Sequence, residues 1–595
     1  MKNWKTLSKL KVKPFGKAQD KSEKLKVDDL ITILLNNRGL NTNQETEEFL
    51  NPKLDRITPK NLKINEKKLK SSIARIKKAV ETNEQIIIYG DYDVDGISGT
   101  AILWETLNSL GANVMPYIPH RTDEGYGLSK KGTDNLLKKY PETKIIITVD
   151  NGIVASAPVD YANSLGLEVI ITDHHVPSQK LPNAYSIVHT TLICGAAVAW
   201  ILSKEMLSVL SRRLSEESKS VVSLSVQLKR KQITGDHLGL VALATVADVM
   251  PLTGFNRTFV KLGLEQIRKT NRPGLLEMLK LAGVDQKKIG VYELGHIIGP
   301  RINATGRITH GIDSLRLICT PNGAKAKELA RNLHVTNAKR QELTIESVAH
   351  AKGIANKNKK IIIISDKLYN PGIIGLISGR ITEEYYRPSI VISETDGVSK
   401  GSARSVTGVN IIEFIRQAKE LLMDAGGHKG AAGFTISTKN IKNFKKFLED
   451  LAEKQIDEKL LIRKIKIDCE LPIELINQKL FDSIQTLAPF GYGNPEPVFL
   501  ARGVEIAGLY YVGKDGNHLK LQLKYQTRFD LEKTSNKGRT LNTPSTMGGI
   551  VFGFDQSLKF ELGDRVDVVY SVYENEWNGN KKLELKIKEI AGSSK

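Results

Sequence analysis

The stretch QIIIYGDYDVDG, from Gln85 to Gly96, joins a short apolar run to three alternating aspartates. The run has the length and β-branched content of a buried strand, and the segment that follows, Ile97 to Leu110, has the length of a helix. Similar apolar runs recur between helix-length segments, at Asn113 to Ile118, Lys144 to Val149 and Leu167 to Ile171. This alternation predicts an α/β domain with a parallel sheet.

The three aspartates, Asp91, Asp93 and Asp95, follow directly on the first predicted strand. Ligands of open α/β sheets gather at the carboxyl ends of the strands. Like charges in one turn repel each other unless a cation or water neutralises them, which favours a bound metal ion. An exposed acidic turn with a helix cap is the alternative, and the segment by itself does not decide between the two.

Two further predicted strands also end in side chains that bind metals. Asp150 follows one of them, and the triplet Asp173-His174-His175 follows the other. Carboxylate oxygens and imidazole nitrogens are ligands of divalent first-row metals. Asp248 is a fourth candidate because it lies in a mostly apolar context, although taken alone it is better explained as a helix-terminal or paired carboxylate.

Several carboxylates with one or two imidazoles suit a pair of divalent ions about 4 Å apart that activate a water molecule, as in phosphoesterases. Mixed oxygen and nitrogen ligands favour manganese, with magnesium as a weaker substitute. The three cysteines, Cys194, Cys319 and Cys469, form no CxxC pair. Their spacing argues against a zinc site, an iron–sulfur cluster or a disulfide framework, and favours a reducing cytoplasm.

Composition narrows the class of protein and of partner. The chain has 595 residues, 40% of them hydrophobic, so several packed domains are expected. Its net charge of +21 favours a polyanionic partner such as nucleic acid, although for the basic residues of segment 1–80 a solvated surface is an equal alternative. The apolar runs are too short to span a membrane, and Met1 to Lys26 lacks the core of a signal peptide, so we expect a cytoplasmic protein with no membrane partner.

The pattern changes after the first predicted sheet. Residues 201–290 are predicted to be helical, and a long helix is expected near Ala324 to Ala355. A second α/β unit begins at Lys359 and runs to about Lys454. Beyond Val498, short alternating segments predict a small β-barrel, interrupted by a long polar loop over residues 527–545.

The acidic and histidine motifs resemble those of the DHH phosphoesterase family, which is named for the triplet that stands here as Asp173-His174-His175. Gly90 to Gly96, Val149 to Gly152 and Ala247 to Val249 are similar to the family's first, second and fourth motifs, in the same order and spacing. Four segments downstream resemble its bacterial single-strand-specific exonucleases: Ile298 to Arg307, Gly401 to Ser405, Gly426 to Gly433 and Leu487 to Pro495. The resemblance covers roughly residues 80–595.

This resemblance implies a chain of α/β class with a DHH parallel-sheet domain, a long connecting helix, a second α/β domain of DHHA1 type and a C-terminal OB-fold β-barrel. The expected boundaries are 1–80 for a basic N-terminal segment, 81–320, 321–357, 358–455 and 456–595 for these four parts in order. The implied activity is processive 5′-to-3′ degradation of single-stranded DNA to 5′-mononucleotides with manganese or magnesium, in DNA repair and recombination. Single-strand-binding protein and a RecQ-type helicase are expected partners, and we expect a monomer.

Carried onto this chain, the resemblance also implies roles for individual side chains. The metal ligands would be Asp91, Asp93, Asp150, His174 and Asp248. Asp95 would support these ligands or bind weakly. Asp93, Asp150 and His175 would act in catalysis. His175 would contact the phosphate or act as an acid, with support of His174 as its alternative role.

Phosphate contacts are implied for a second set of side chains: Arg121, Arg301, Asn303, Arg307, Ser402, Arg404 and His428. The alternative for Arg121 is a pair with Asp123 or Glu124. The alternative for Arg301 and Arg307 is an interdomain ion pair, and we favour a phosphate clamp for at least one of them.

In the predicted barrel, several aromatic residues stand amid lysines, as a single-strand platform requires, while core packing is their alternative role. They are Tyr510, Tyr511, His518, Tyr573 and Trp577. Trp577 is expected to be exposed, whereas Phe552 and Phe560 are expected in the core.

The chain departs from the family pattern at Tyr89, where histidine is common, and in the short segment Ile187 to Thr191. Two other functions therefore stay open. One is a DHH phosphodiesterase for short oligonucleotides or cyclic dinucleotides, and the other is a catalytically silent single-strand-binding scaffold.

Overall fold

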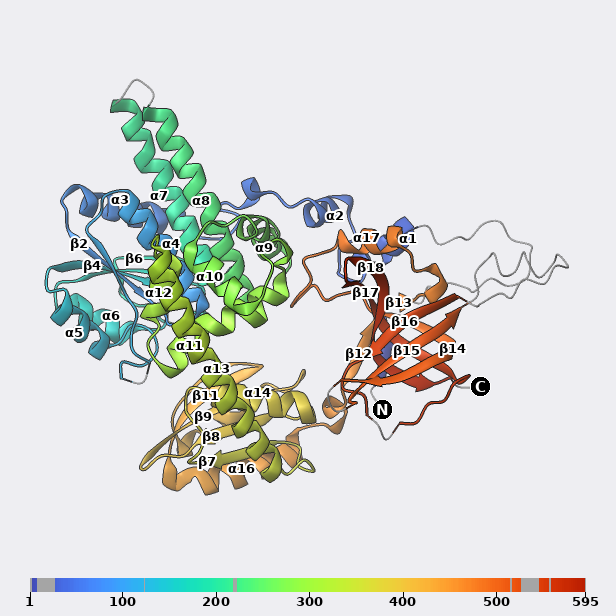
Figure 1. Cartoon of the computed structure of the whole chain (residues 1–595). Helices are drawn as coiled ribbons and strands as arrows, with labels where there is room; N and C mark the ends of the chain where they lie inside the picture. Colours follow the sequence, from blue (N-terminus) through green and yellow to red (C-terminus); the bar gives the residue numbers. More distant parts are fainter. Residues whose placement is uncertain are drawn as a thin grey trace. The chain divides into compact units, whose positions relative to one another are not determined.

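The computed structural model describes residues 3–7, 27–121, 123–217, 222–513, 516–525, 545–555 and 558–593 (Figure 1). It divides into two compact units, residues 53–463 and residues 1–52 with 464–595. The basic segment 1–80 is therefore shared between the two units. The expected loop over residues 527–545, apart from its last residue, and the side chain of Trp577 lie outside the described residues.

The first sheet of unit 53–463 is parallel throughout, as predicted, with the order β3-β2-β4-β5-β6. Its strands are β2 (Gln85–Gly90), β3 (Val114–Tyr117), β4 (Thr143–Val149), β5 (Glu168–Asp173) and β6 (Ser186–His189). Because the strands are parallel, the carboxyl ends of β2, β4 and β5 lie at the same edge. The three strand-end motifs singled out in the sequence therefore meet there.

Helices cover both faces of this sheet, because the side chains of each strand alternate between them. Ile86 and Ile88 of β2 pack into one apolar cluster, and Ile87 and Tyr89 pack into another on the opposite face. The first cluster is shared with α3 (Glu66–Glu81), α4 (Val94–Ser109), α7 (Gly195–Glu217) and α8 (Val222–Ala247). The second is shared with α5 (Lys130–Lys139) and α6 (Ser156–Ser164).

A helical region follows, as predicted, and leads into the long helix. It consists of α9 (Gly254–Ile267), α10 (Pro273–Ala282), α11 (Gly299–Ile308), α12 (Ile312–Cys319) and α13 (Gly323–Ile354). Helix α13 begins where the side chain of Asn322 accepts a hydrogen bond from the backbone N–H of Lys325. Its bounds differ by one residue at each end from those expected.

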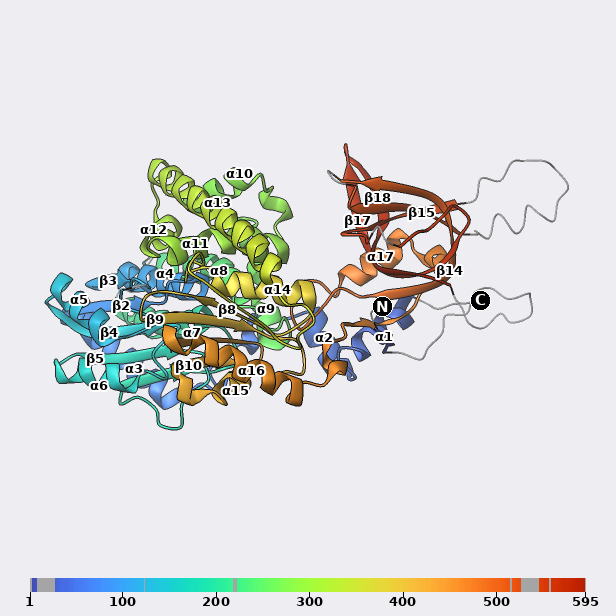
Figure 2. The same cartoon turned by 90° about the horizontal axis from the view of Figure 1, so that it is seen from below.

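The second sheet has the order β10-β11-β9-β8-β7. Its strands are β7 (Ile362–Asp366), β8 (Ser389–Ser393), β9 (Val398–Arg404), β10 (Leu422–His428) and β11 (Ala431–Ser437). Figure 2 shows α14 (Ile374–Tyr385) on one side of it and α15 (Ile411–Arg416) with α16 (Ile441–Gln455) on the other, and the apolar side chains divide between two clusters accordingly.

The C-terminal unit contains a six-stranded sheet of order β13-β14-β15-β16-β18-β17, in which β14 also pairs with β17 and closes the sheet on itself. Its strands are β13 (Cys469–Glu470), β14 (Phe499–Val512), β15 (His518–Tyr525), β16 (Ser545–Val551), β17 (Arg565–Trp577) and β18 (Asn580–Gly592). No described helix is long and apolar enough to cross a membrane.

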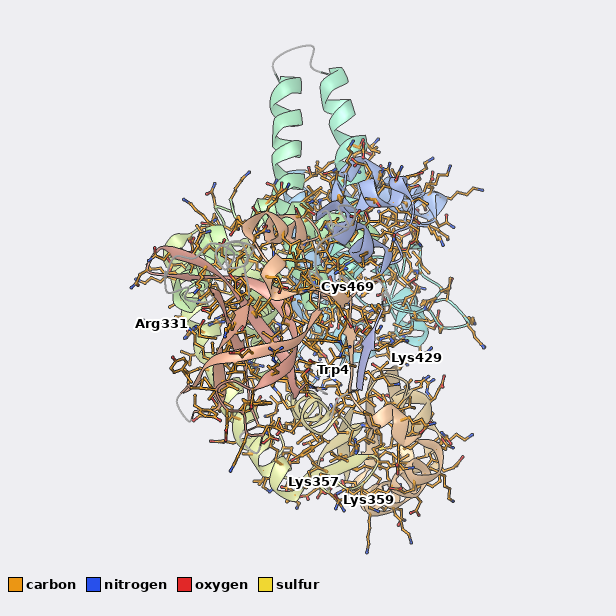
Figure 3. All side chains as sticks on the ribbon, turned by 90° about the vertical axis from the view of Figure 1, so that its right-hand side faces the viewer. Trp4, Arg331, Lys357, Lys359, Lys429 and Cys469 are labelled. Carbon is orange, nitrogen blue, oxygen red and sulfur yellow. The ribbon has the colours of Figure 1, made fainter. Side chains whose placement is uncertain are left out.

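The N-terminal residues contribute to this same unit. Leu30 and Leu34 of α1 (Val27–Asn36) and Phe49 of α2 (Asn43–Leu50) join the core of the barrel, together with α17 (Gln478–Gln485). A strand that the sequence analysis did not predict, β1 (Asn3–Thr6), pairs in parallel with β12 (Lys464–Ile467). Trp4, labelled in Figure 3, packs against a small apolar cluster of this unit.

Candidate metal centre and phosphate-binding residues

The turn between β2 and α4 buries two of its three acidic residues. Asp91 and Asp95 are each 1% exposed, so the exposed-turn alternative is wrong. Asp93 caps α4, because its carboxylate accepts hydrogen bonds from the backbone N–H groups of Asp95 (2.9 Å) and Gly96 (3.1 Å). A Cβ atom at Gly96 would lie 2.6 Å from the backbone N and O of Asp91, so only glycine fits at this point.

The imidazole of His174 lies among three carboxylates. Its Nε2 atom is 3.1 Å from Asp150 Oδ1, 3.5 Å from Asp95 Oδ2 and 3.6 Å from Asp248 Oδ2. Three polar atoms in this cluster are buried without a hydrogen-bond partner among the described residues: Asp91 Oδ1, Asp150 Oδ1 and His174 Nε2. Burial raises the pKa of Asp91 and of Asp150, and the neighbouring carboxylates raise both further.

This donor set fits divalent metal ions. Buried carboxylates without partners are costly unless a cation neutralises them, and oxygen with imidazole nitrogen is the ligand chemistry of manganese. Three groups have potential ligand atoms within 4.8 Å of one another: Asp91, Asp93 and Asp150; Asp95, His174 and Asp248; and Asp150, His174 and His175. The structure thus brings together every side chain expected to bind metal.

Asp95 also binds the start of α7. Its two carboxylate oxygens accept hydrogen bonds from the backbone N–H groups of Gly195 and Ala196, each at 2.7 Å, at the start of α7. A Cβ atom at Gly195 would lie 2.7 Å from Asp150 Cβ, so α7 approaches β4 closely. These contacts suit the supporting role expected for Asp95.

His175 is oriented by Asp173. Its Nδ1 atom lies 2.8 Å from Asp173 Oδ1. Burial alone would lower the pKa of His175, but the Asp173 carboxylate outweighs it and the pKa is raised to about 9. The Nε2 atom of His175 lies 3.3 Å from the hydroxyl of Tyr126, which the sequence analysis did not select. The ring of Tyr126 is half exposed while its hydroxyl reaches the Asp150 carbonyl at 3.4 Å, so this side chain borders the site.

Tyr89 points away from the metal cluster. Its ring stacks on Tyr117 with the centroids 5.3 Å apart, and its hydroxyl donates to the carbonyl of Gly127 at 3.2 Å. Tyr89 belongs to none of the three ligand groups found in the described part of the chain. It fills the apolar cluster under α5 and α6 instead.

Arg121 packs on an aromatic ring beside the acidic turn. Its guanidinium carbon lies 5.2 Å from the centre of the Tyr92 ring. Asp123 lies 3.3 Å from Nδ1 of His120, and Glu124 accepts hydrogen bonds from Tyr117 and Asn135. No ion pair of Arg121 with either carboxylate is found among the residues that the structure describes.

Helix α11 carries the other predicted donors of the first domain. The Asn303 side chain accepts a hydrogen bond from the backbone N–H of Val94 (2.9 Å) and so ties α11 to the start of α4. Arg307 donates to the carbonyl of Gly372 (3.1 Å), and Arg301 donates to the carbonyl of Ile297 (2.6 Å). Within the described ranges neither arginine has a carboxylate partner, so the alternative role, an interdomain ion pair, is not found there.

The second domain contributes donors next to Arg307. Arg404 donates to the Ser402 hydroxyl at 3.3 Å, and both lie beside the N-terminal end of α14. Burial lowers the pKa of Arg307 to about 10, and the nearby charges of Arg121 and Arg404 contribute. His428 is exposed and stands in one row with Ala431 and Arg404 across three strands, which places it on the same face of the sheet as Arg404.

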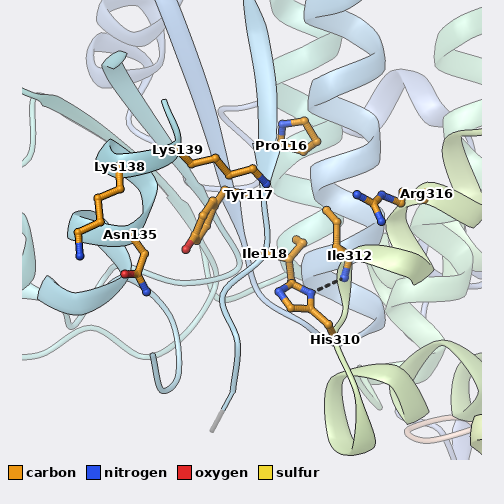
Figure 4. A pocket seen from close by; sticks show the side chains of 9 residues that line it. All are labelled: Pro116, Tyr117, Ile118, Asn135, Lys138, Lys139, His310, Ile312 and Arg316. Carbon is orange, nitrogen blue, oxygen red and sulfur yellow. Dashed lines mark hydrogen bonds between the residues drawn. The ribbon is translucent and has the colours of Figure 1, made fainter. Parts of the chain in front are cut away.

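A surface pocket of about 480 Å³ lies at the edge strand β3 (Figure 4). It is lined by Pro116, Tyr117, Ile118, Asn135, Lys138, Lys139, His310, Ile312 and Arg316. None of these residues belongs to the metal cluster, so this pocket is separate from the site.

The metal-free protein is expected to lose stability as the pH rises. Burial and the charges of Asp95 and Asp93 raise the pKa of Asp248 to about 8. The folded state therefore holds a proton that the unfolded chain, with a pKa of about 3.9 for aspartate, has released. The resulting stabilisation is complete below about pH 4 and is lost as the pH rises to about 8. Urea unfolding in chelator between pH 4 and pH 8 measures this, and a rise in stability over that range would contradict it.

Family models identify the domains. The DHH family N-terminal domain matches residues 85–245, the DHHA1 domain residues 358–454 and the RecJ OB domain residues 467–589. The fold and the site thus define a phosphoesterase of the DHH family, as the sequence motifs predicted.

Comparison with known relatives identifies the family of this chain within the DHH class. The single-stranded-DNA-specific exonuclease RecJ of Bacillus subtilis is 32% identical over 97% of this chain and 70% of its own length. The crystal structure of Thermus thermophilus RecJ in complex with Mn²⁺ superposes with a TM-score of 0.77 at 27% identity, over 100% of this chain and 80% of that one. Its complex with Mg²⁺ gives a TM-score of 0.72 at 27% identity, over 100% and 79%. The chain belongs to the RecJ family of single-stranded-DNA-specific exonucleases.

Proposed function

We propose that this protein is a single-stranded-DNA-specific exonuclease that removes 5′-mononucleotides in the 5′-to-3′ direction. One observation carries the proposal. A buried cluster of unpaired carboxylate and imidazole atoms lies beside arginines that have no carboxylate partner among the described residues. The first group suits divalent metal ions, and the second suits the phosphates of a strand.

Two divalent ions, with Mn²⁺ preferred over Mg²⁺, would be held by Asp91, Asp93, Asp150, His174 and Asp248. When bound, such ions supply an activated water and neutralise charge that develops on the phosphate. The carboxylate of Asp93 is held in place because it caps α4. Asp150 is positioned by β4, which ends directly before it. His175, fixed by Asp173 at 2.8 Å, directs its Nε2 atom toward the hydroxyl of Tyr126, where it can hold a proton beside the scissile group.

The phosphates of the strand would be held by side chains from both domains of unit 53–463. Arg121, Arg301 and Arg307 donate from the first domain, and Ser402, Arg404 and His428 donate from the second. Asn303 orients α11 through its bond to Val94 and so places the two arginines of that helix. We further propose domain boundaries at 81–320, 321–357, 358–455 and 456–595.

The C-terminal unit would bind single strands through exposed aromatic rings. Tyr510 and Tyr511 are at least half exposed on β14. The ring of His518 packs against Phe552 at 5.3 Å, and Phe552 is 54% exposed, so the expectation that it lies in the core is wrong. Tyr573 donates instead to Glu584. Stacking on such rings tolerates every base.

Tyr510→Ala is expected to weaken binding of single-stranded DNA about tenfold, because one stacked base is worth about 1–3 kcal/mol. Fluorescence anisotropy with a labelled oligothymidine in chelator measures it. Phe447→Ala, which removes an exposed ring on α16 of the other unit, is the matched control and should bind as the wild type does. Equal affinity of both variants would exclude Tyr510 from the binding surface.

Digestion of labelled oligonucleotides tests the function itself. Single- and double-stranded substrates with 5′ or 3′ labels, and a cyclic dinucleotide, are incubated with Mn²⁺ and either the wild type or Asp93→Ala. We expect mononucleotides from the 5′ end of single strands only, and none with the variant. Turnover of the cyclic substrate alone would support a small-molecule phosphodiesterase, and binding without cleavage would support a silent scaffold.

The proposal also covers the cellular location, the oligomeric state and the partners of the protein. We place the protein in the cytoplasm, as a monomer in DNA repair and recombination, with single-strand-binding protein and a RecQ-type helicase as partners. The net charge of +21 supports association with nucleic acid.

A further inference from the structure

Arg340 is a half-buried cation on the connecting helix that has no role in the proposed function. The buried stripe of α13 runs through Ala326, Ala330, Leu333 and Asn337, and Arg340 is the next position of this stripe. Helix α13 packs against α11, and Ile302 of α11 shares its apolar cluster with Leu333. Arg340 therefore lies on the face of α13 that packs against other elements, α11 among them.

Arg340 lies near Arg301, and neither arginine has a carboxylate partner among the residues described. The Nε atoms of Arg340 and Arg301 are both buried without a hydrogen-bond partner among the residues described. Burial lowers the pKa of Arg340, and the nearby charges of Arg301 and Arg380 lower it further. Arg380 lies 3.2 Å from Glu383, whereas the described residues give Arg340 and Arg301 no carboxylate. Two like charges held in this way are costly unless an anion joins them.

The geometry of α11 separates this anion from the one at the second domain. Arg307 donates to the carbonyl of Gly372, beside the start of α14 where Ser402 and Arg404 lie. Arg301 stands six residues earlier on α11, about 9 Å along the helix axis. Arg301 with Arg340 thus forms one group of donors, and Arg307 with Ser402 and Arg404 forms another. A single phosphate contacts only donors within hydrogen-bond reach, so the two groups suit successive phosphates of one strand.

We propose that Arg340 and Arg301 bind a second phosphodiester of the DNA strand, distinct from the phosphate held by Ser402 and Arg404. This inference rests on the proposed function, because its ligand is the same single strand. A second phosphate site makes the protein favour polynucleotides over dinucleotides, which lack that phosphate. Arg340 is a binding residue in this account, and the reacting atoms lie elsewhere.

A double-mutant cycle between protein and DNA tests the proposal. Twelve-residue oligothymidines carry one neutral methylphosphonate at each of the first five linkages in turn, and anisotropy in chelator gives the affinities. For the wild type we expect a loss of about tenfold at the linkage that Arg340 contacts, the effect of one charge-assisted hydrogen bond. Arg340→Gln should bind the unmodified strand about tenfold more weakly and show no further loss at that one linkage.

Two further variants keep the test decisive. Arg331→Gln removes an exposed arginine of the same helix, labelled in Figure 3, and should match the wild type at every linkage. Arg340→Lys retains the charge, so it should retain most of the coupling even if Arg340→Gln unfolds at lower temperature. The salt dependence of Arg340→Gln should also fall by about 0.7 in log–log slope, one phosphate of a single strand.

Two outcomes would overturn the inference. One is equal losses for wild type and Arg340→Gln at all five linkages, and the other is unchanged affinity of the variant for the unmodified strand. Failure of the proposed function is a different result, because the wild type itself would then neither bind nor digest the unmodified strand.

Discussion

Asp150→Asn is expected to lower exonuclease activity by about 10³-fold or more, with Mn²⁺ present. Asp150 belongs to two of the three ligand groups, and its Oδ1 atom lies 3.1 Å from Nε2 of His174. An amide keeps the shape of the side chain but removes the charge that holds a divalent ion, and with it the electrostatic stabilisation of the reaction. Release of mononucleotides from a labelled single strand measures the loss.

The effect of Asp150→Asn on the free energy of unfolding should depend on whether Mn²⁺ is present. Burial and the charges of Asp95, Asp93 and Asp91 raise the pKa of Asp150, so its charged form is unfavourable in the metal-free protein. In chelator, Asp150→Asn should therefore be at least as stable as the wild type. With Mn²⁺ at about 100 times its dissociation constant, the wild type gains about 2.7 kcal/mol, and the variant should lose most of that gain.

Thermal unfolding with and without Mn²⁺ separates these effects. Asp160→Asn, which neutralises an exposed aspartate on α6, is the matched control and should respond to Mn²⁺ as the wild type does. If Asp150→Asn were clearly less stable than the wild type in chelator, Asp150 would be a structural residue rather than a metal ligand.

Gly96→Ala is expected to abolish most activity and to destabilise the protein by about 1–3 kcal/mol, the usual result of overpacking a core. The added methyl group would lie 2.6 Å from three atoms of Asp91, including its backbone N and O. Because these contacts are with backbone atoms, the strand end itself must shift, and Asp91 and Asp93 would shift with it. Activity with Mn²⁺ and the midpoint of thermal unfolding measure the two parts.

Gly353→Ala is the matched control for Gly96→Ala, because Gly353 is also a glycine within a helix. A Cβ atom at this position of α13 meets nothing within 4 Å. The substitution should raise stability by about 0.5–1 kcal/mol, because alanine favours a helix over glycine, and leave activity unchanged. Full activity of Gly96→Ala would show that the turn tolerates movement of Asp91.

Local pattern was enough to predict the parallel sheet and the edge where candidate ligands gather, while the full ligand set followed from the resemblance to the DHH family. The apolar runs around Ile86, Ile146 and Ile170 have the length of buried strands, and helix-length segments between them require a parallel order. Parallel order then brings Asp91, Asp150 and Asp173 to one edge with no further information. The long helix was equally readable, because the pattern of residues 324–355 is a local feature.

Contacts between distant segments could not be predicted in this way. Tyr126 reaches Asp150 and His175 only because the loop after β3 folds back over the strand ends, and Arg340 meets Arg301 only through the packing of two helices. The strand Asn3–Thr6 has four residues and gains its pairing from a segment more than 450 residues away. Phe552 looks like a core residue in sequence, but it stands in the turn just after β16, and only the closed barrel shows that its ring is exposed.

The pairing of β1 with β12 has a consequence for how the protein is made. The ribosome delivers residues 1–52 before residues 53–463, yet the unit that residues 1–52 complete also needs residues 464–595. The apolar faces of α1 and α2, with Leu30, Leu34 and Phe49, must therefore wait while all of residues 53–463 is synthesised and folds. The unit formed by residues 1–52 and 464–595 should therefore complete its folding after residues 53–463.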